Sequence, residues 1–171
     1  KPLWRALAFG VPLRDCLGWS QPILAPFSGK VVEAVDGVEE RDPVHLVREL
    51  LGVVKNGLFF KPESNAAMRN LLGNFLILEG ENCFAFLAHA RHGSISVREG
   101  ERIESGARIA EVGHSGNSTA PHLHFQLMDG PLLLEAKGLP CCFKEYELFE
   151  GGHWRRVQNG IPGRREHIRV R

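Results

Sequence analysis

Two histidines one residue apart, His122 and His124, lie in the apolar stretch HLHFQLM, directly after the polar loop HSGNSTAP. Residues i and i+2 of a β-strand project from the same face, so a strand here would present both imidazoles side by side and direct Leu123 and Phe125 into a core. Neutral imidazoles on one face can bind a zinc ion together, or one can bind the metal while the other transfers protons. The pattern therefore indicates metal or proton-transfer chemistry, with a merely polar strand face as the alternative.

Strands are needed to position these histidines, and the sequence predicts several. The stretch NFLILEG and the following NCFAFLAHA, which contains His89, are rich in strand-forming residues. The segment GSISVREGERIESGARIAEVG predicts short strands broken by glycines and charged pairs, as in an antiparallel all-β core. Residues 23–35 predict a β-hairpin, because a turn containing Pro and Gly precedes alternating residues from Val31 to Val35. We therefore expect a mainly β fold with an antiparallel, sandwich-like core.

The period of the apolar residues changes between these strands. Asp42 and Pro43 have the residue types preferred at an N-cap and at the first helical position. A helix over 43–55, ended by KNG, would place five apolar residues on one face: Val44, Val47, Leu50, Leu51 and Val54. A short second helix is predicted near residues 66–72. The segment 42–72 is thus expected to be a helical insertion between strands.

Length and composition bound the domain organisation. With 171 residues, of which 43% are hydrophobic and 24% charged, the chain has enough apolar material for one domain over residues 1–171. Within it we expect an N-terminal segment (1–22), a β core with its insertion (23–130) and a C-terminal extension of short strands (131–171). The formal net charge is +1 and the basic residues are spread out apart from an Arg-rich end, so no nucleic-acid partner is predicted.

Few features bear on the cellular compartment. No apolar run approaches the roughly 20 residues that span a bilayer, so the chain is not expected to be membrane-spanning. It has neither an initiator Met nor a signal-peptide pattern, which indicates a processed or truncated product. The cysteines lack CxxC spacing, which argues against a zinc ribbon and leaves both a disulfide and free thiols open: Cys16, Cys83, Cys141 and Cys142.

The order of the motifs resembles a known family. The stretch SGNSTAPHLHFQ, preceded by REGERIESGARIAEVG, is similar to the lysostaphin/LytM-type zinc endopeptidases, the murein hydrolase family. Upstream, ILAPFSGKVVEA resembles that family's first hairpin, GNFLILEG its next strand, and FAFLAHARHGSISVREGERI the strand with its second His motif. The resemblance covers residues 23–130, and it implies a β-sandwich peptidase fold.

The resemblance also implies roles for individual residues. In that family the second His of HxH, here His124, binds zinc. The first, here His122, lies beside the metal-bound water, and the family's other catalytic His, the partner of His122, corresponds to His89. Zinc lowers the pKa of the water and polarises the scissile carbonyl, and the two non-ligand imidazoles relay protons and stabilise the oxyanion. The implied substrates are peptide cross-bridges of peptidoglycan in the cell wall. The implied location is the periplasm or the cell exterior, and a regulatory protein partner is a further option.

The chain departs from the family pattern upstream. A catalytic zinc takes three protein ligands, and the family's other two are a His and an Asp before the first hairpin. The stretch KPLWRALAFGVPLRDCLGWSQP has no His, and its single acidic residue is Asp15. Three explanations stay open: the His precedes Lys1 and the Asp has become Ala8 or a neighbour; Asp15, Cys16 or His114 substitutes; or the metal has been lost.

Other residues near the motifs have weaker signals. Leu87 stands where the family has a Tyr two residues before the catalytic His, which argues against full activity. His114 either rims the site or substitutes as a ligand, whereas Asn117, Ser118 and Thr119 are expected to shape the turn through side-chain to backbone hydrogen bonds. The remaining histidines are expected to be solvated: His45, His92, His153 and His167.

Three functions are therefore compatible with the sequence. The first is a zinc-dependent endopeptidase of the peptidoglycan hydrolase type. The second is a catalytically inactive domain of the same fold that binds cell wall or regulates another hydrolase. The third is a carrier domain, since APFSGKVVEA followed by GERIESGARIAEV also resembles biotinyl and lipoyl domains. The turn GHSGNS has no lysine to bear such a cofactor.

Overall fold

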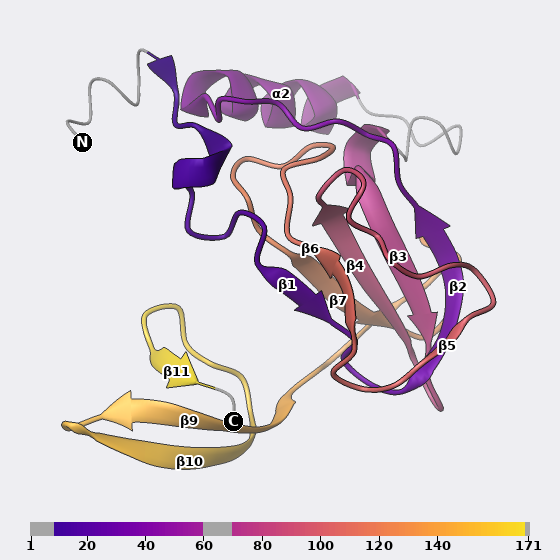
Figure 1. Cartoon of the computed structure of the whole chain (residues 1–171), viewed down its shortest axis with the longest axis vertical. Coiled ribbons are helices and arrows are strands. Elements are labelled where there is room, and N and C mark those ends of the chain that lie inside the picture. The colour runs from indigo at the N-terminus through magenta and orange to yellow at the C-terminus, as the bar shows by residue number, and fades with distance from the viewer. Residues whose placement is uncertain (1–8, 60–69, 170–171) are drawn as a thin grey trace. The chain divides into compact units, whose positions relative to one another are not determined.

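Antiparallel strands form the main sheet of the first of two units, in the order β5-β2-β3-β4-β7 within residues 1–137 (Figure 1). The computed structural model describes residues 9–59 and 70–169. The strands are β2 (Gly29–Val35), β3 (Asn74–Glu79), β4 (Phe84–Ala90), β5 (Arg102–Ile103) and β7 (His124–Met128). A two-stranded sheet, β1 (Pro22–Leu24) with β6 (Arg108–Glu111), lies against it, and η1 (Leu13–Asp15) precedes β1. The predicted mainly β, antiparallel fold class is confirmed.

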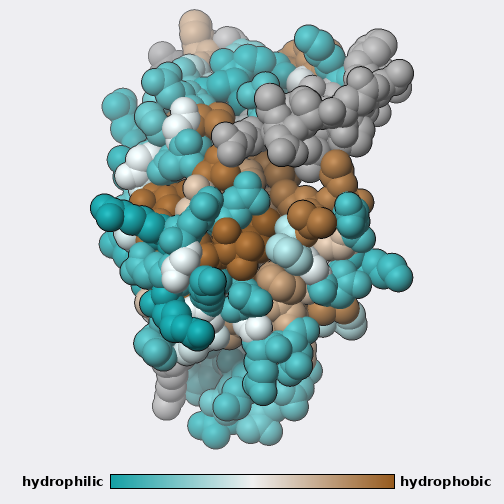
Figure 2. Space-filling model, turned by 90° about the vertical axis from the view of Figure 1, so that its right-hand side faces the viewer, coloured by the Kyte–Doolittle hydropathy of each residue, from teal (hydrophilic) through white to brown (hydrophobic). Residues whose placement is uncertain are grey.

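Apolar side chains cover both faces of the main sheet. One cluster joins it to the β1–β6 sheet and includes Ile23, Leu76, Leu87 and Ile109, all buried. The other lies on the opposite face, around Phe75, Phe86 and Met128. Both faces of β3 are therefore buried, which explains why NFLIL is a continuous apolar run rather than an alternating one. Seen from the side of β2, apolar and hydrophilic residues are interspersed on the surface (Figure 2).

The predicted hairpin over residues 23–35 is wrong. β1 pairs with β6 and β2 pairs with β3 and β5, so the turn between β1 and β2 carries the chain from one sheet to the other. The pairing of β2 with β3 shifts register between Val31 and Glu33. A bulge of this kind reverses which face the later residues point to. Val31 consequently packs in the first cluster and Val35 in the second.

The predicted inserted helix is present as α2 (Leu46–Phe59), but it begins and ends later than residues 43–55. Asp42 does not cap it, because its carboxylate accepts a hydrogen bond from the Leu13 amide at 3.1 Å. Val44 pairs with Val11 through two backbone hydrogen bonds, which holds this residue in a β-bridge. The second predicted helix lies mostly outside the described residues.

The apolar face predicted for the inserted helix is largely exposed. Val47, Leu50, Leu51 and Val54 are 50–64% exposed, and of the five predicted residues only Val44 is buried. Among the described side chains of α2, the buried one is Glu49, which is 4% exposed. A charged group in such a place must be paired, and its partners are described below.

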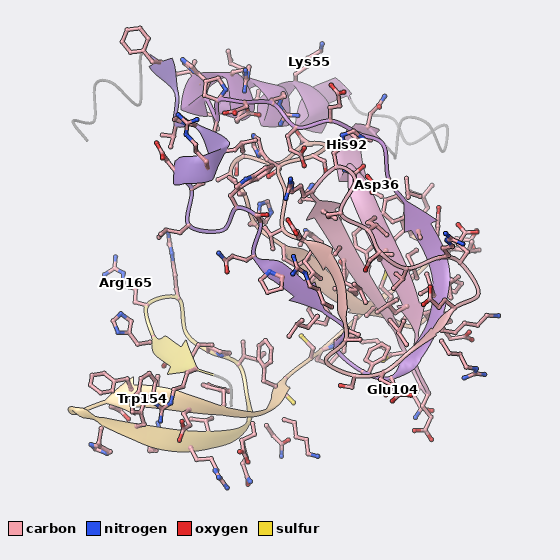
Figure 3. The ribbon with its side chains drawn as sticks, in the orientation of Figure 1. Asp36, Lys55, His92, Glu104, Trp154 and Arg165 are labelled. Atoms are coloured by element: carbon pink, nitrogen blue, oxygen red, sulfur yellow. The ribbon has the colours of Figure 1, made fainter. Side chains whose placement is uncertain are left out.

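The second unit, residues 138–171, consists of β8 (Gly138–Leu139), β9 (Phe143–Glu150), β10 (His153–Gly160) and β11 (His167–Arg169). The last three form an antiparallel sheet in the order β10-β9-β11. Trp154, labelled in Figure 3, packs against Phe149, and the Arg169 guanidinium lies 4.2 Å from its ring centroid.

All four cysteines are free thiols. Among the residues described, none of the helices is long and apolar enough to cross a membrane.

Candidate active site

Three histidines from two separate parts of the chain come together at one end of the main sheet. His89 is near the end of β4, His122 is in the loop before β7, and His124 is the first residue of β7. The ring centroid of His89 lies 4.9 Å from that of His122 and 6.2 Å from that of His124. These three side chains are called the histidine cluster below. The structure thus brings together all three residues that the sequence assigned to the site.

A β-bulge turns His89 toward its neighbours. In the pairing of β3 with β4, Asn74 is opposite Ala90 and Phe75 is opposite Ala88, so His89 is the extra residue. Its φ of 65° is in the left-handed region, which is uncommon outside glycine. Ala88 is paired with His124, and in a regular strand His89 would point to the opposite face. The bulge therefore places the His89 ring beside His124, and backbone strain of this kind concentrates at functional sites.

The loop before β7 fixes the protonated nitrogen of two rings. The Nδ1 atom of His89 lies 2.9 Å from the Ser115 carbonyl oxygen, and that of His122 lies 2.7 Å from the Ala120 carbonyl oxygen. A carbonyl oxygen only accepts hydrogen bonds, so Nδ1 donates in both cases. Each neutral ring therefore leaves Nε2 unprotonated, as a base or metal ligand requires.

Two histidines of the cluster, His89 and His124, have lowered pKa values. Burial, together with the neighbouring His122, lowers the pKa of His89 to about 4, against the opposing effect of its hydrogen bond to Ser115. Burial is also the main cause that lowers the pKa of His124, with His122 adding to it. Neutral imidazole is the form that accepts a proton or binds a metal. Both residues are thus in the form that hydrolytic chemistry needs.

The described residues do not complete a zinc site. No group of three or more His, Cys, Asp or Glu side chains among them is arranged to hold a metal ion, whereas a catalytic zinc takes three protein ligands. Burial, with Asp15 and Asp42, raises the pKa of the Cys16 thiol, and this disfavours the thiolate that binds metal. Of the residues outside the described ranges, only Glu63 has a side chain of a metal-binding type (His, Cys, Asp or Glu).

His114 is not part of the cluster. It is fully buried and its Nε2 lies 3.7 Å from Glu49 Oε1, so it neither rims the site nor joins a metal-binding group among the described residues. Burial lowers its pKa, although Glu49 acts in the opposite direction.

The other sequence expectations have mixed outcomes. Ser118 shapes the turn as expected, because its hydroxyl donates to the Ala120 carbonyl at 2.7 Å. Leu123 packs on the core, whereas Phe125 is 37% exposed, contrary to expectation. Three of the remaining histidines are exposed as predicted, and only His45 is half-buried: the exposed ones are His92, His153 and His167. His92 lies in the turn after β4, near Asp36 (Figure 3).

Sequence reasoning missed Ser115 and Arg41, which hold the loop behind the cluster. Ser115 Oγ accepts from the Asn74 amide at 3.0 Å and donates to the Ala90 carbonyl at 2.8 Å. Arg41 donates to the carbonyls of Gly116 and Ser118. Ser115 lies beside the motif, and its position between His114 and Gly116 was a usable signal. Arg41 has no local signal, because it is 75 residues from Gly116 in the chain.

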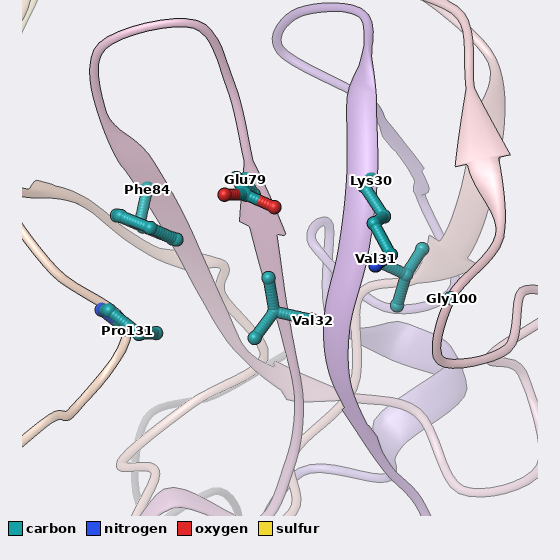
Figure 4. Close-up of a pocket in the computed structure, with 7 residues that line it drawn as sticks. All are labelled: Lys30, Val31, Val32, Glu79, Phe84, Gly100 and Pro131. Atoms are coloured by element: carbon teal, nitrogen blue, oxygen red, sulfur yellow. The ribbon is translucent and has the colours of Figure 1, made fainter.

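A pocket of about 280 Å³ lies elsewhere on the sheet. It is lined by Lys30, Val31, Val32, Glu79, Phe84, Gly100 and Pro131 (Figure 4). Phe84 begins β4, five residues before His89, which corresponds to roughly 17 Å along a strand. The pocket is therefore separate from the histidine cluster.

Comparison with known proteins gives a family and several similar structures. A mutant catalytic domain of the prophage-encoded M23 protein EnpA from Enterococcus faecalis is 18% identical, with a TM-score of 0.46 over 72% of this chain and 69% of that chain. The catalytic domain of the antimicrobial peptidase lysostaphin from Staphylococcus simulans is 22% identical, with a TM-score of 0.45 and coverage of 72% and 70%. The structure of LytU is 23% identical, with a TM-score of 0.46 and coverage of 72% and 65%.

The family model covers the site itself. Residues 53–134 match the model described as peptidase family M23. This range includes β3, β4 and β7 and all three residues of the histidine cluster. Residues 53–134 are therefore similar to peptidase family M23, which agrees with the resemblance of the motifs to the lysostaphin/LytM-type peptidases.

Proposed function

We propose that this protein is a zinc-dependent endopeptidase of the peptidoglycan hydrolase type, and that it acts on peptide cross-bridges at the histidine cluster. The observation that carries the proposal is the pair of rings held by backbone carbonyls. His89 donates Nδ1–H to Ser115 and His122 donates Nδ1–H to Ala120, so both rings have Nε2 as their free acceptor. The match of residues 53–134 to peptidase family M23 supports peptides as the substrate class.

The chain's own residues then handle protons. A neutral His89 or His122 accepts a proton at Nε2 from the attacking water, and the imidazolium so formed donates it to the leaving amine or to the oxyanion. The low pKa of His89 keeps this ring unprotonated at neutral pH. The Ser115 and Ala120 carbonyls hold both rings in one tautomer throughout, so no ring needs to turn between accepting and donating.

The metal part of the proposal rests on His124. Its ring is 6.2 Å from His89 between centroids, and burial keeps it neutral, as a ligand must be. Zinc, when bound, would supply an activated water and polarise the carbonyl. The other two protein ligands are not supplied by the described residues, so the zinc-binding set of this chain is incomplete there.

That incomplete set favours a second function. The same domain without metal would bind cell-wall peptides, or regulate another hydrolase, without cutting them. Its specific support is that the described residues provide no three-ligand group, although the geometry of the histidine cluster is retained. A cell-envelope substrate places either form in the periplasm or outside the cell, with a regulatory protein as a further partner.

Zinc content and cleavage distinguish the two functions. We would measure zinc per chain after dialysis, and release of new amino termini from purified peptidoglycan, for the wild type, His124→Ala and the control His92→Ala. The endopeptidase proposal expects about one zinc per chain, cleavage by the wild type and the control, and loss of both in His124→Ala. A wild type without zinc and without cleavage overturns it. Retention of that protein by insoluble peptidoglycan would then support the binding function, and lack of retention would reject both.

A further inference from the structure

An ion pair between the half-buried Arg41 and the buried Glu49 lies behind the loop that holds the histidine cluster. The Arg41 guanidinium donates from Nη1 to the Gly116 carbonyl at 2.6 Å and from Nη2 to the Ser118 carbonyl at 3.1 Å. The same Nη2 and the Nε atom donate to Glu49 Oε2 at 2.7 and 3.1 Å. One side chain therefore connects α2 to the loop between β6 and β7.

The partner of Arg41 is the single buried carboxylate of α2 among its described side chains. Burial raises the pKa of Glu49, but hydrogen bonds from Arg41 and Arg48 outweigh this effect and its net pKa is lowered. Arg48 binds the other oxygen, Oε1, at 2.7 Å and the Pro43 carbonyl at 2.6 Å, and in these bonds it does not reach the loop. The Glu49 carboxylate is thus charged, and each of its oxygens accepts from an arginine. It therefore fixes the orientation of the Arg41 guanidinium.

The two loop carbonyls that Arg41 binds lie in the chain between the Ser115 and Ala120 carbonyls, which accept from the histidines. Gly116 directly follows Ser115, whose carbonyl accepts from His89. Ser118 accepts from Arg41 through its carbonyl, and its hydroxyl lies 3.2 Å from His122 Nδ1. On the other side, the Asn117 amide donates to the Leu71 carbonyl at 2.8 Å. Without Arg41, the part of the loop from Gly116 to Ser118 would keep this single backbone anchor among the contacts described here.

We propose that Arg41, held by Glu49 of α2, is a positioning residue that fixes the loop from Gly116 to Ser118 and thereby keeps His89 and His122 in the Nδ1–H tautomer. The inserted helix is on this view a support of the site. The proposal rests on the proposed function only for its effect on catalysis. The orientation of the rings is a property of the metal-free protein and is tested without cleavage.

The direct test is the tautomeric state of the two rings, read from the ¹⁵N chemical shifts of their side-chain nitrogens in the metal-free protein. We expect well-separated Nδ1–H and bare Nε2 signals for His89 and His122 in the wild type. In Arg41→Ala the two signals of each ring should move toward averaged values, because both tautomers become accessible. In the matched control Arg48→Ala, which removes an ion pair to the same carboxylate, the signals should stay at their wild-type positions.

A conservative variant separates positioning from folding. Arg41→Lys keeps a positive charge beside Glu49 but lacks the planar fork that reaches two carbonyls and a carboxylate together. It should fold, by its thermal unfolding midpoint, and still show averaged signals. The proposal is overturned if folded Arg41→Lys keeps the wild-type signals, or if Arg48→Ala averages them equally.

Cleavage, where it is found, gives an independent reading. Arg41→Lys should then lower kcat at least about tenfold with KM little changed, because ring orientation affects the transition state more than substrate binding. Absence of cleavage by the wild type rejects the proposed function and leaves the ¹⁵N result to decide the role of Arg41.

Discussion

The buried His89 should make the protein lose stability at mildly acidic pH. Its pKa is about 4 in the folded chain, against an ordinary value of 6.5. The unfolded chain therefore takes up a proton as the pH falls below 6.5, while the folded chain does not until about pH 4. At about 1.4 kcal/mol per pH unit, the full loss in the free energy of unfolding is about 3 kcal/mol. Between pH 7 and pH 5 it is about 2 kcal/mol.

Comparison of the wild type with His89→Gln isolates this contribution. We would measure urea unfolding of the metal-free protein at pH 7, 6 and 5 by far-UV circular dichroism. His89→Gln should lose about 2 kcal/mol less than the wild type over this range, whereas a variant of the exposed His92 should follow the wild type. Glu49 has a pKa lowered below its ordinary 4.5, so it titrates below this window. Equal losses in the wild type and His89→Gln, or a His89 ring that titrates near 6.5 by NMR, would refute the reasoning.

Two further predictions concern the loop and the thiols. Gly116→Ala should cost more than Gly93→Ala, since both glycines have positive φ but a Cβ on Gly116 would overlap the backbone of Gly73, whereas Gly93 faces open space. We expect about 1 kcal/mol for Gly93 and about 1–3 kcal/mol more for Gly116, measured by urea unfolding, and equal costs would contradict the described packing. Cys16 should react more slowly with iodoacetamide at neutral pH than the exposed Cys141, because burial raises the pKa of its thiol. Mass spectrometry of the labelled peptides checks this, and equal rates would show that the Cys16 thiol is not protected.

The prediction of the fold from sequence succeeded where the signal was local. The continuous apolar run in β3 and the strand that contains His89 were identified from residue types alone. The hairpin over residues 23–35 was predicted wrongly, because the same Pro- and Gly-containing turn serves equally well to move the chain between two sheets. The helical spacing of the apolar residues of α2 did not show whether that face is buried. Periodicity shows that a helix has two faces. It does not show that α2 buries the Glu49 carboxylate, which is paired with Arg41 and Arg48.

For the site, the sequence by itself determined which side chains were available: the HxH pair, His89, and an upstream stretch without a zinc-binding His. The tertiary structure decided how they are oriented. The bulge at His89 depends on the register of β4 with β3, and the tautomers of His89 and His122 depend on which carbonyls the loop turns toward them. Arg41 reaches that loop across 75 residues of sequence. A hydrogen bond between distant segments leaves no periodic pattern in the chain, so only the folded arrangement reveals it.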